Sequence, residues 1–101
     1  YVYMEEMLRG FTAASFDAAS AAMCGLNTMP RLPKIKVPAI VIATPDDPGV
    51  PTETSKMMAK ALGARLHWLE PAQHLASLEH VERFNELMRQ FLVTVLEAPQ
   101  F

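Results

Sequence analysis

The feature that most constrains the fold is a run of five apolar residues, Ala39-Ile40-Val41-Ile42-Ala43. Its three central residues are β-branched and no polar residue alternates with them, as in strands of a parallel sheet that are covered on both faces. Pro38 precedes the run, and a stretch with two acidic residues and three prolines follows it over residues 44–51. The run therefore predicts a central strand of an α/β protein, with a loop after it.

The residues beyond this strand alternate between helical and extended patterns. Apolar residues recur at helical spacing over residues 52–62, and Gly63 suits the C-terminal cap of that helix. Residues 64–69 predict a second short strand, and a continuous apolar stripe over residues 79–97 predicts a long helix. Two strands joined by one helix predict a parallel, right-handed βαβ unit. Because only two strands are visible, we expect the native sheet to contain more strands than these residues provide.

The N-terminal third has a different pattern. Apolar residues at helical spacing predict one helix over residues 1–11 and a second from Phe16 to Leu26, with Ser15 as its N-cap. Residues 28–38 contain three prolines with basic residues between them. This stretch predicts an extended connector between two parts of the chain.

Charge and cysteine usage limit the partners that we expect. The 101 residues include 9 Lys and Arg and 11 Asp and Glu, so the formal net charge is −2 and no basic field favours nucleic acid or an anionic membrane surface. The longest apolar run, residues 37–43, is too short to span a bilayer. The single cysteine, Cys24, cannot form an internal disulfide. We therefore expect a cytoplasmic protein with no nucleic-acid or membrane partner.

Two predicted loops carry the residues with the clearest chemistry. Asp46 and Asp47 follow the first strand, and His74 follows the second. The carboxyl ends of parallel strands meet at one edge of a sheet, so a carboxylate and the imidazole can meet there. A carboxylate that accepts a hydrogen bond from Nδ1–H of histidine fixes its tautomer and stabilises the imidazolium, which is the acid–base half of a nucleophilic triad. A structural interpretation stays open, since an aspartate before a proline favours turns and loop histidines often serve only as hydrogen-bonding groups.

Two segments resemble one enzyme family. Residues 37–51, VPAIVIATPDDPGVP, resemble the acid-strand segment of α/β-hydrolase-fold enzymes, which usually reads V-P-x-L-V-I-x-G-x-x-D-x-x-x-P. This register makes Asp47 the acid, because Asp46 would misplace the final proline. Residues 71–79, PAQHLASLE, resemble the histidine loop of the same family, in which a glutamate follows His74 by five positions. That glutamate is expected to steady the loop.

The resemblance implies an α/β fold class and a division of the chain. Residues 1–34 would be the end of a helical cap with its connector, and residues 35–101 would be the C-terminal part of an α/β-hydrolase core. Three positions depart from the family pattern: Thr44 replaces the usual glycine, Gln73 a small residue, and Val81 the usual proline. None of these changes removes a catalytic group.

The nucleophile of the family lies in a G-x-S-x-G elbow that precedes the acid and the histidine in chain order. No serine of this chain lies between glycines in that pattern, and neither Cys24 nor Ser77 is a good candidate, so we expect the nucleophile on a segment that precedes Tyr1. The resemblance implies hydrolysis of a small-molecule carboxylic ester or lactone through an acyl-enzyme, as in small carboxylesterases and 3-oxoadipate enol-lactonases. Asp47 and His74 would be the catalytic residues, and no cofactor or metal would be needed.

Several alternatives stay open. Haloalkane dehalogenases, C–C bond hydrolases and cofactor-free haloperoxidases share these C-terminal signatures, because their distinguishing residues lie at the elbow and in the cap. A hydrolase-fold protein that has lost its nucleophile and binds a ligand or a partner is a non-enzymatic alternative. The last alternative is a small independent α/β module that associates through its apolar sheet edge.

Overall fold

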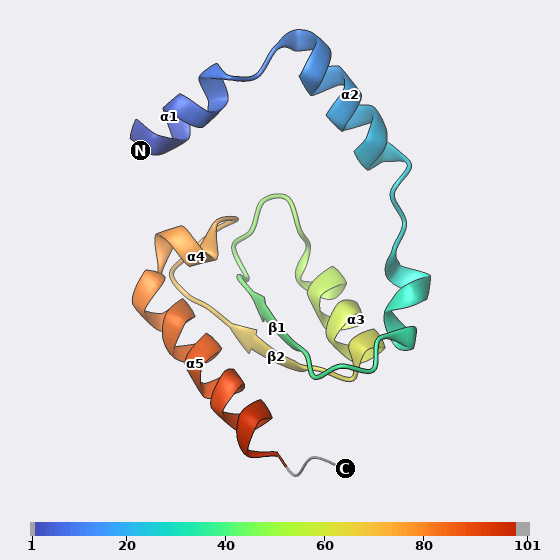
Figure 1. Cartoon of the computed structure of the whole chain (residues 1–101), viewed down its shortest axis with the longest axis vertical. Coiled ribbons are helices and arrows are strands. Elements are labelled where there is room, and N and C mark those ends of the chain that lie inside the picture. The colour runs from blue at the N-terminus through green and yellow to red at the C-terminus, as the bar shows by residue number, and fades with distance from the viewer. Residues whose placement is uncertain (1, 99–101) are drawn as a thin grey trace.

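The two predicted strands form and lie side by side. In the computed structural model, which describes residues 2–98, β1 (Ile40–Ala43) pairs in parallel with β2 (Arg65–Trp68). Helix α3 (Thr52–Leu62) connects them, so the expected parallel βαβ arrangement is confirmed. The register sets Ala43 opposite Trp68, which brings the carboxyl ends of both strands to the same level (Figure 1).

Helix α3 spans the predicted residues and ends as predicted. Gly63 follows it with φ 61°, in the left-handed region that glycine adopts at little cost, and its N–H donates to the last turn of the helix. The helix buries Ser55 and Ala59 and packs against β1 and β2. The long C-terminal helix α5 (Val81–Glu97) lies on the other side of the strands, where it buries Leu87 (Figure 1).

A short helix, α4 (Ala76–Glu79), precedes α5 and corrects the expected boundary. The sequence predicted one continuous helix over residues 79–97. Instead His80 has φ −139° and separates the two helices. The turn lets α4 leave the histidine loop in a different direction from α5 (Figure 1).

The N-terminal segment forms an arch above the carboxyl end of the strands (Figure 1). Its helices are α1 (Val2–Arg9) and α2 (Ala13–Cys24). The N-cap of α2 is Thr12, not the predicted Ser15. The Thr12 hydroxyl accepts from the N–H of Ser15 at 3.0 Å, and the Ser15 hydroxyl accepts from the N–H of Thr12 at 2.9 Å. This reciprocal pair starts the helix three residues earlier than expected.

The proline-rich connector is not fully extended, which corrects another expectation. Residues Met29–Lys34 form a 3₁₀ helix, η1, with a proline in its first turn. Proline fixes φ near the helical value and lacks only an N–H that the first turn leaves unpaired, so it is tolerated there. The segment packs against α3 and leads from the arch to β1.

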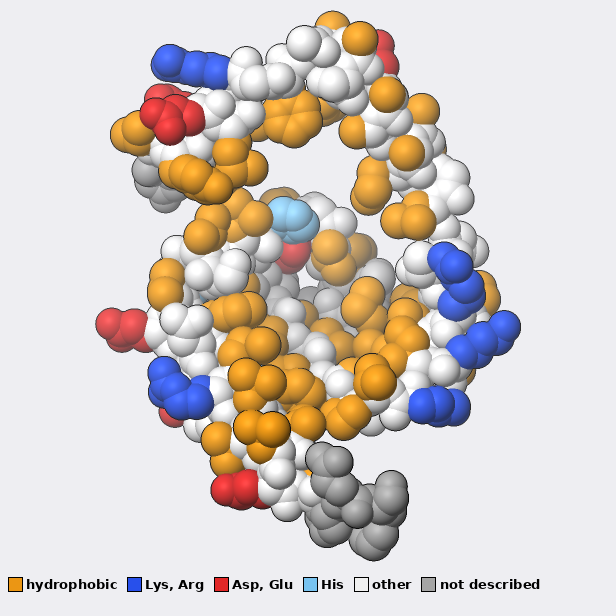
Figure 2. Space-filling view, viewed as in Figure 1, with side chains coloured by type: hydrophobic (Ala, Val, Ile, Leu, Met, Phe, Trp, Pro, Cys, Tyr) orange, Lys and Arg blue, Asp and Glu red, His pale blue; other side chains and the backbone are white. Residues whose placement is uncertain are grey.

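The core is small, and much apolar surface is exposed. Its central cluster consists of Leu69, Ala72 and Leu87, with Ile42, Ala76 and Phe84 packed against it. In β1 only Val41 is buried, so the described residues do not cover both faces of this strand as predicted. Neither α1 nor α2 buries a residue within the described chain. Figure 2 shows the resulting apolar side chains on the inner side of the arch and across the lower part of the molecule. No helix among residues 2–98 is long and apolar enough to cross a bilayer.

Residues 1–101 expressed alone should not melt cooperatively. Only five apolar residues are buried among the described residues, and two of them are alanines with little side-chain surface, whereas ordering the backbone costs about 1–2 kcal/mol for every residue. The measurement is a thermal melt with amide hydrogen exchange of the isolated chain. A monomer with a cooperative melt and protected amides in residues 40–43 would contradict this prediction and favour the independent module.

Candidate active site

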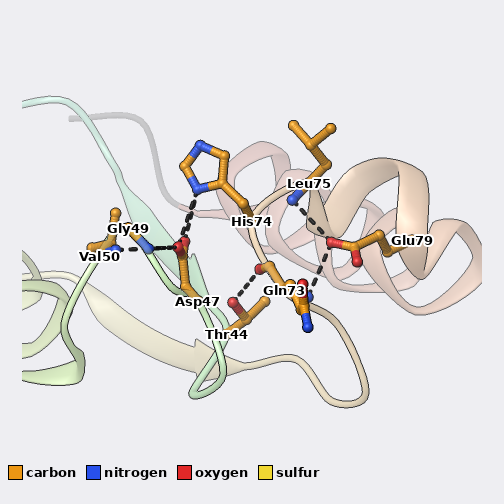
Figure 3. A network of polar contacts seen from close by, with 8 residues as sticks. All are labelled: Thr44, Asp47, Gly49, Val50, Gln73, His74, Leu75 and Glu79. Atoms are coloured by element: carbon orange, nitrogen blue, oxygen red, sulfur yellow. Dashed lines mark hydrogen bonds and ion pairs between the residues drawn. The ribbon is translucent and has the colours of Figure 1, made fainter. Parts of the chain in front are cut away.

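The carboxylate of Asp47 is held by its own loop after β1. Its Oδ1 accepts hydrogen bonds from the N–H groups of Gly49 at 2.7 Å and Val50 at 3.1 Å (Figure 3). Gly49 lies so close that a Cβ there would contact Asp47 Oδ1 at 3.5 Å. The turn therefore fixes the orientation of the carboxylate and leaves Oδ2 facing the second loop.

The imidazole of His74 meets this carboxylate from the loop after β2. Its Nδ1 lies 3.0 Å from Oδ2 and 3.2 Å from Oδ1 of Asp47 (Figure 3). The side chain of Asp47 is 11% exposed and that of His74 is 63% exposed. Asp46 is exposed and forms no hydrogen bond with His74. Asp47, and not its neighbour Asp46, therefore contacts His74, as the register of the acid-strand pattern predicted.

The pKa of the Asp47 carboxyl is lowered from its ordinary value of 3.8. The largest cause is the hydrogen bond from the Gly49 N–H; the His74 side chain and the Val50 N–H act in the same direction, while partial loss of solvent opposes them. Asp47 is therefore ionised at neutral pH and can only accept. Because it carries no proton, Nδ1 of His74 is the donor, and Nε2 is left free to accept a proton.

Two further contacts hold the backbone on either side of His74. One carboxylate oxygen of Glu79, Oε2, accepts from the N–H of Gln73 and from the N–H of Leu75, both at 3.0 Å (Figure 3). The buried Thr44 hydroxyl donates to the carbonyl of Gln73. The glutamate was expected to steady the loop, whereas the role of Thr44 was not foreseen, because its partner lies 29 positions away in the chain.

A cavity of about 770 Å³ opens beside His74 and is lined by Tyr3, Met4, Pro71, Gln73, His74, Leu75, Leu78 and Glu79. It lies between α1 of the arch and the histidine loop, in the hollow visible in Figure 2. Most of its lining is apolar, and its polar groups are the imidazole, the carboxylate of Glu79, the phenol of Tyr3 and the amide of Gln73. The arrangement can accept a small organic molecule next to a basic nitrogen.

The other candidate residues are not part of this site. Among the described residues no serine or cysteine forms a hydrogen bond with His74, and Cys24 is exposed at the end of α2. His67 lies on β2 and His80 lies between the last two helices. Residues 2–98 contain no group of three or more His, Cys, Asp and Glu that could hold a metal ion.

A histidine paired with a carboxylate beside a cavity is suited to acid–base chemistry, and a comparison with known families identifies the class of protein. The family model described as serine hydrolase matches residues 10–92. The chain therefore belongs to the serine hydrolase family. The expectation of a hydrolase family is thus confirmed, and the parallel sheet with flanking helices is consistent with an α/β-hydrolase fold.

Individual relatives give a more specific comparison than the family does. The chain is 34% identical over 77 residues to a 2-hydroxy-6-oxo-6-phenylhexa-2,4-dienoate hydrolase of Delftia acidovorans, covering 75% of this chain and 27% of the relative. It is 40% identical over 63 residues to 2-hydroxy-6-oxononadienedioate/2-hydroxy-6-oxononatrienedioate hydrolases of Burkholderia vietnamiensis and Paraburkholderia phymatum, covering 61% of this chain and 22% of each relative. The chain thus spans about a quarter of the length of these relatives.

Proposed function

We propose that this chain supplies the acid and the base of a hydrolase that attacks a carbonyl carbon through a nucleophilic side chain. The observation that carries the proposal is the contact of 3.0 Å between Nδ1 of His74 and the ionised carboxylate of Asp47. His74 Nε2 would take the proton of the nucleophile and return it to the leaving group, then activate the water that releases the acyl group. Asp47 would hold the tautomer and stabilise the imidazolium.

The nucleophile is proposed to lie on a preceding segment that carries a G-x-S-x-G elbow. Its serine Oγ would lie about one hydrogen bond from Nε2, on the side of the imidazole opposite Asp47. In this proposal residues 35–101 form the C-terminal part of an α/β-hydrolase core, and residues 1–34 belong to the end of a cap. Support comes from the exposed flanks of the two-stranded sheet and from the apolar inner side of the arch.

The names of the relatives favour a 2-hydroxy-6-oxo-dienoate as the substrate. Such compounds hold a ketone but no ester, so their hydrolysis breaks a carbon–carbon bond next to the carbonyl. The departing carbon is protonated while the acyl group stays on the nucleophile. A carboxylic ester or lactone is the second candidate, favoured by the likeness of residues 37–51 and 71–79 to carboxylesterases and enol-lactonases. In both reactions His74 transfers the same proton, and only the leaving group differs.

The substrate class can be tested with the protein that contains this chain and its preceding segment. We expect turnover of 2-hydroxy-6-oxo-6-phenylhexa-2,4-dienoate, followed by loss of its absorbance, to exceed that of p-nitrophenyl butyrate. A reversed order would select the ester or lactone type. Binding of both compounds without turnover of either, in a protein with no nucleophile at the elbow, would support the non-catalytic alternative.

A further inference from the structure

Glu79 is not part of the pair formed by Asp47 and His74, but its carboxylate binds the backbone of the loop that carries His74. One of its oxygens accepts the backbone N–H of the residue before His74 and the backbone N–H of the residue after it, both at 3.0 Å. The two amides thus converge on a single point, with His74 between them (Figure 3). A carboxylate that receives two charge-assisted hydrogen bonds in this way fixes the local path of the chain.

The contact of Thr44 restrains the same loop from the opposite side. Its hydroxyl reaches from the end of β1 to the carbonyl of Gln73, one residue before His74. The imidazole itself is 63% exposed, so packing around the ring does little to set its position. Its placement against Asp47 therefore depends on the backbone that carries it.

We propose that Glu79 is a positioning residue for His74, acting through the amides of Gln73 and Leu75 and assisted by the hydroxyl of Thr44. The inference rests on the proposed function, because it assigns the role to the proposed base. Glu79 also lines the cavity beside His74, so direct contact with a substrate is the competing explanation. The two explanations differ in the kinetic constant that they change: mispositioning of the base lowers kcat, whereas loss of a substrate contact raises KM.

The experiment compares E79A, E79Q and E79D in the enzyme that contains this chain. Because a single oxygen accepts both amides, the glutamine carbonyl can replace it, whereas the aspartate is one methylene too short to reach them. We expect E79A and E79D to lower kcat about 10- to 100-fold with KM unchanged, and E79Q to stay within about 5-fold of the wild type. T44V should lower kcat in the same direction, and T44S should preserve it. The matched control is E82A, a change at an exposed glutamate in the first turn of α5.

Amide hydrogen exchange of Gln73 and Leu75 gives a readout that does not depend on activity. We expect exchange about 10- to 100-fold faster in E79A than in E79Q or E82A, since the two acceptor contacts are lost. Unchanged exchange, or a change in KM alone, would overturn the positioning role. If E79A does not fold, the positioning role is tested by the other two variants, of which E79Q should have a higher kcat than E79D. Failure of the proposed function would look different: the wild type would not hydrolyse any substrate, or H74A would keep full activity.

Discussion

Replacing His74 by alanine should lower kcat by several orders of magnitude, about 10³- to 10⁶-fold, in the enzyme that contains this chain. The substitution removes the nitrogen that would take the proton of the nucleophile, and among the described residues no second histidine forms a hydrogen bond with Asp47. The fold should change little, because the side chain is 63% exposed and the contacts of Glu79 and Thr44 with the loop backbone remain. The measurement is steady-state hydrolysis with a thermal melt of both proteins.

Two other histidines provide matched controls for this substitution. H67A and H80A change the same residue type on β2 and between the last two helices, away from the carboxylate of Asp47. Both side chains are half-buried, and neither forms a hydrogen bond with Asp47, so both variants should keep kcat within about 3-fold. Near-normal turnover by H74A, with the controls unchanged, would rule out His74 as the base.

Much of the strand and site geometry could be predicted from the sequence because it follows from short-range patterns. The apolar run before Thr44 predicted β1, and glycine at position 63 predicted the end of α3. The meeting of Asp47 and His74 was predicted from topology, since both loops leave the same edge of parallel strands. The choice of Asp47 over its neighbour Asp46 came from the resemblance of residues 37–51 to the acid-strand segment of α/β-hydrolases, in which a proline follows the acid by four positions.

Two kinds of feature were not predicted from the sequence. In one, two neighbouring residues were equally good candidates for the same role; in the other, a side chain contacts a residue far away in the sequence. Thr12 and Ser15 are both good N-cap residues, and their reciprocal bonds favoured the earlier start of α2. The hydroxyl of Thr44 acquires its role only when the carbonyl of Gln73 folds against it. No local pattern reports such a contact. The burial of β1 was also overestimated. Its apolar residues indicate that the strand must be buried, but they do not indicate which part of the protein buries it.

Replacing Asp47 by asparagine should lower kcat about as severely, roughly 10⁴-fold, although the side chains are nearly the same size. The N–H groups of Gly49 and Val50 both donate to Oδ1, so the asparagine oxygen should stay at that position. Its amide –NH₂ then replaces Oδ2, 3.0 Å from Nδ1 of His74. A donor at this place forces Nδ1 to accept and puts the proton on Nε2, where it blocks transfer from the nucleophile.

The contact between Asp47 and His74 also predicts how stability depends on pH and provides a control for D47N. Because the pKa of Asp47 is lowered below 3.8, its ionised contact with His74 is fully present above that pH and is lost as the pH falls through the folded-state pKa. D47N lacks the ionised carboxylate at every pH, so the part of the acid-induced loss of stability that comes from this contact should be absent from the variant. D46N, a change at the exposed neighbour, should leave kcat near the wild-type value. ¹⁵N NMR of His74 should report a hydrogen on Nδ1 in the wild type and on Nε2 in D47N. An unchanged tautomer with full activity in D47N would show that Asp47 only shapes its turn.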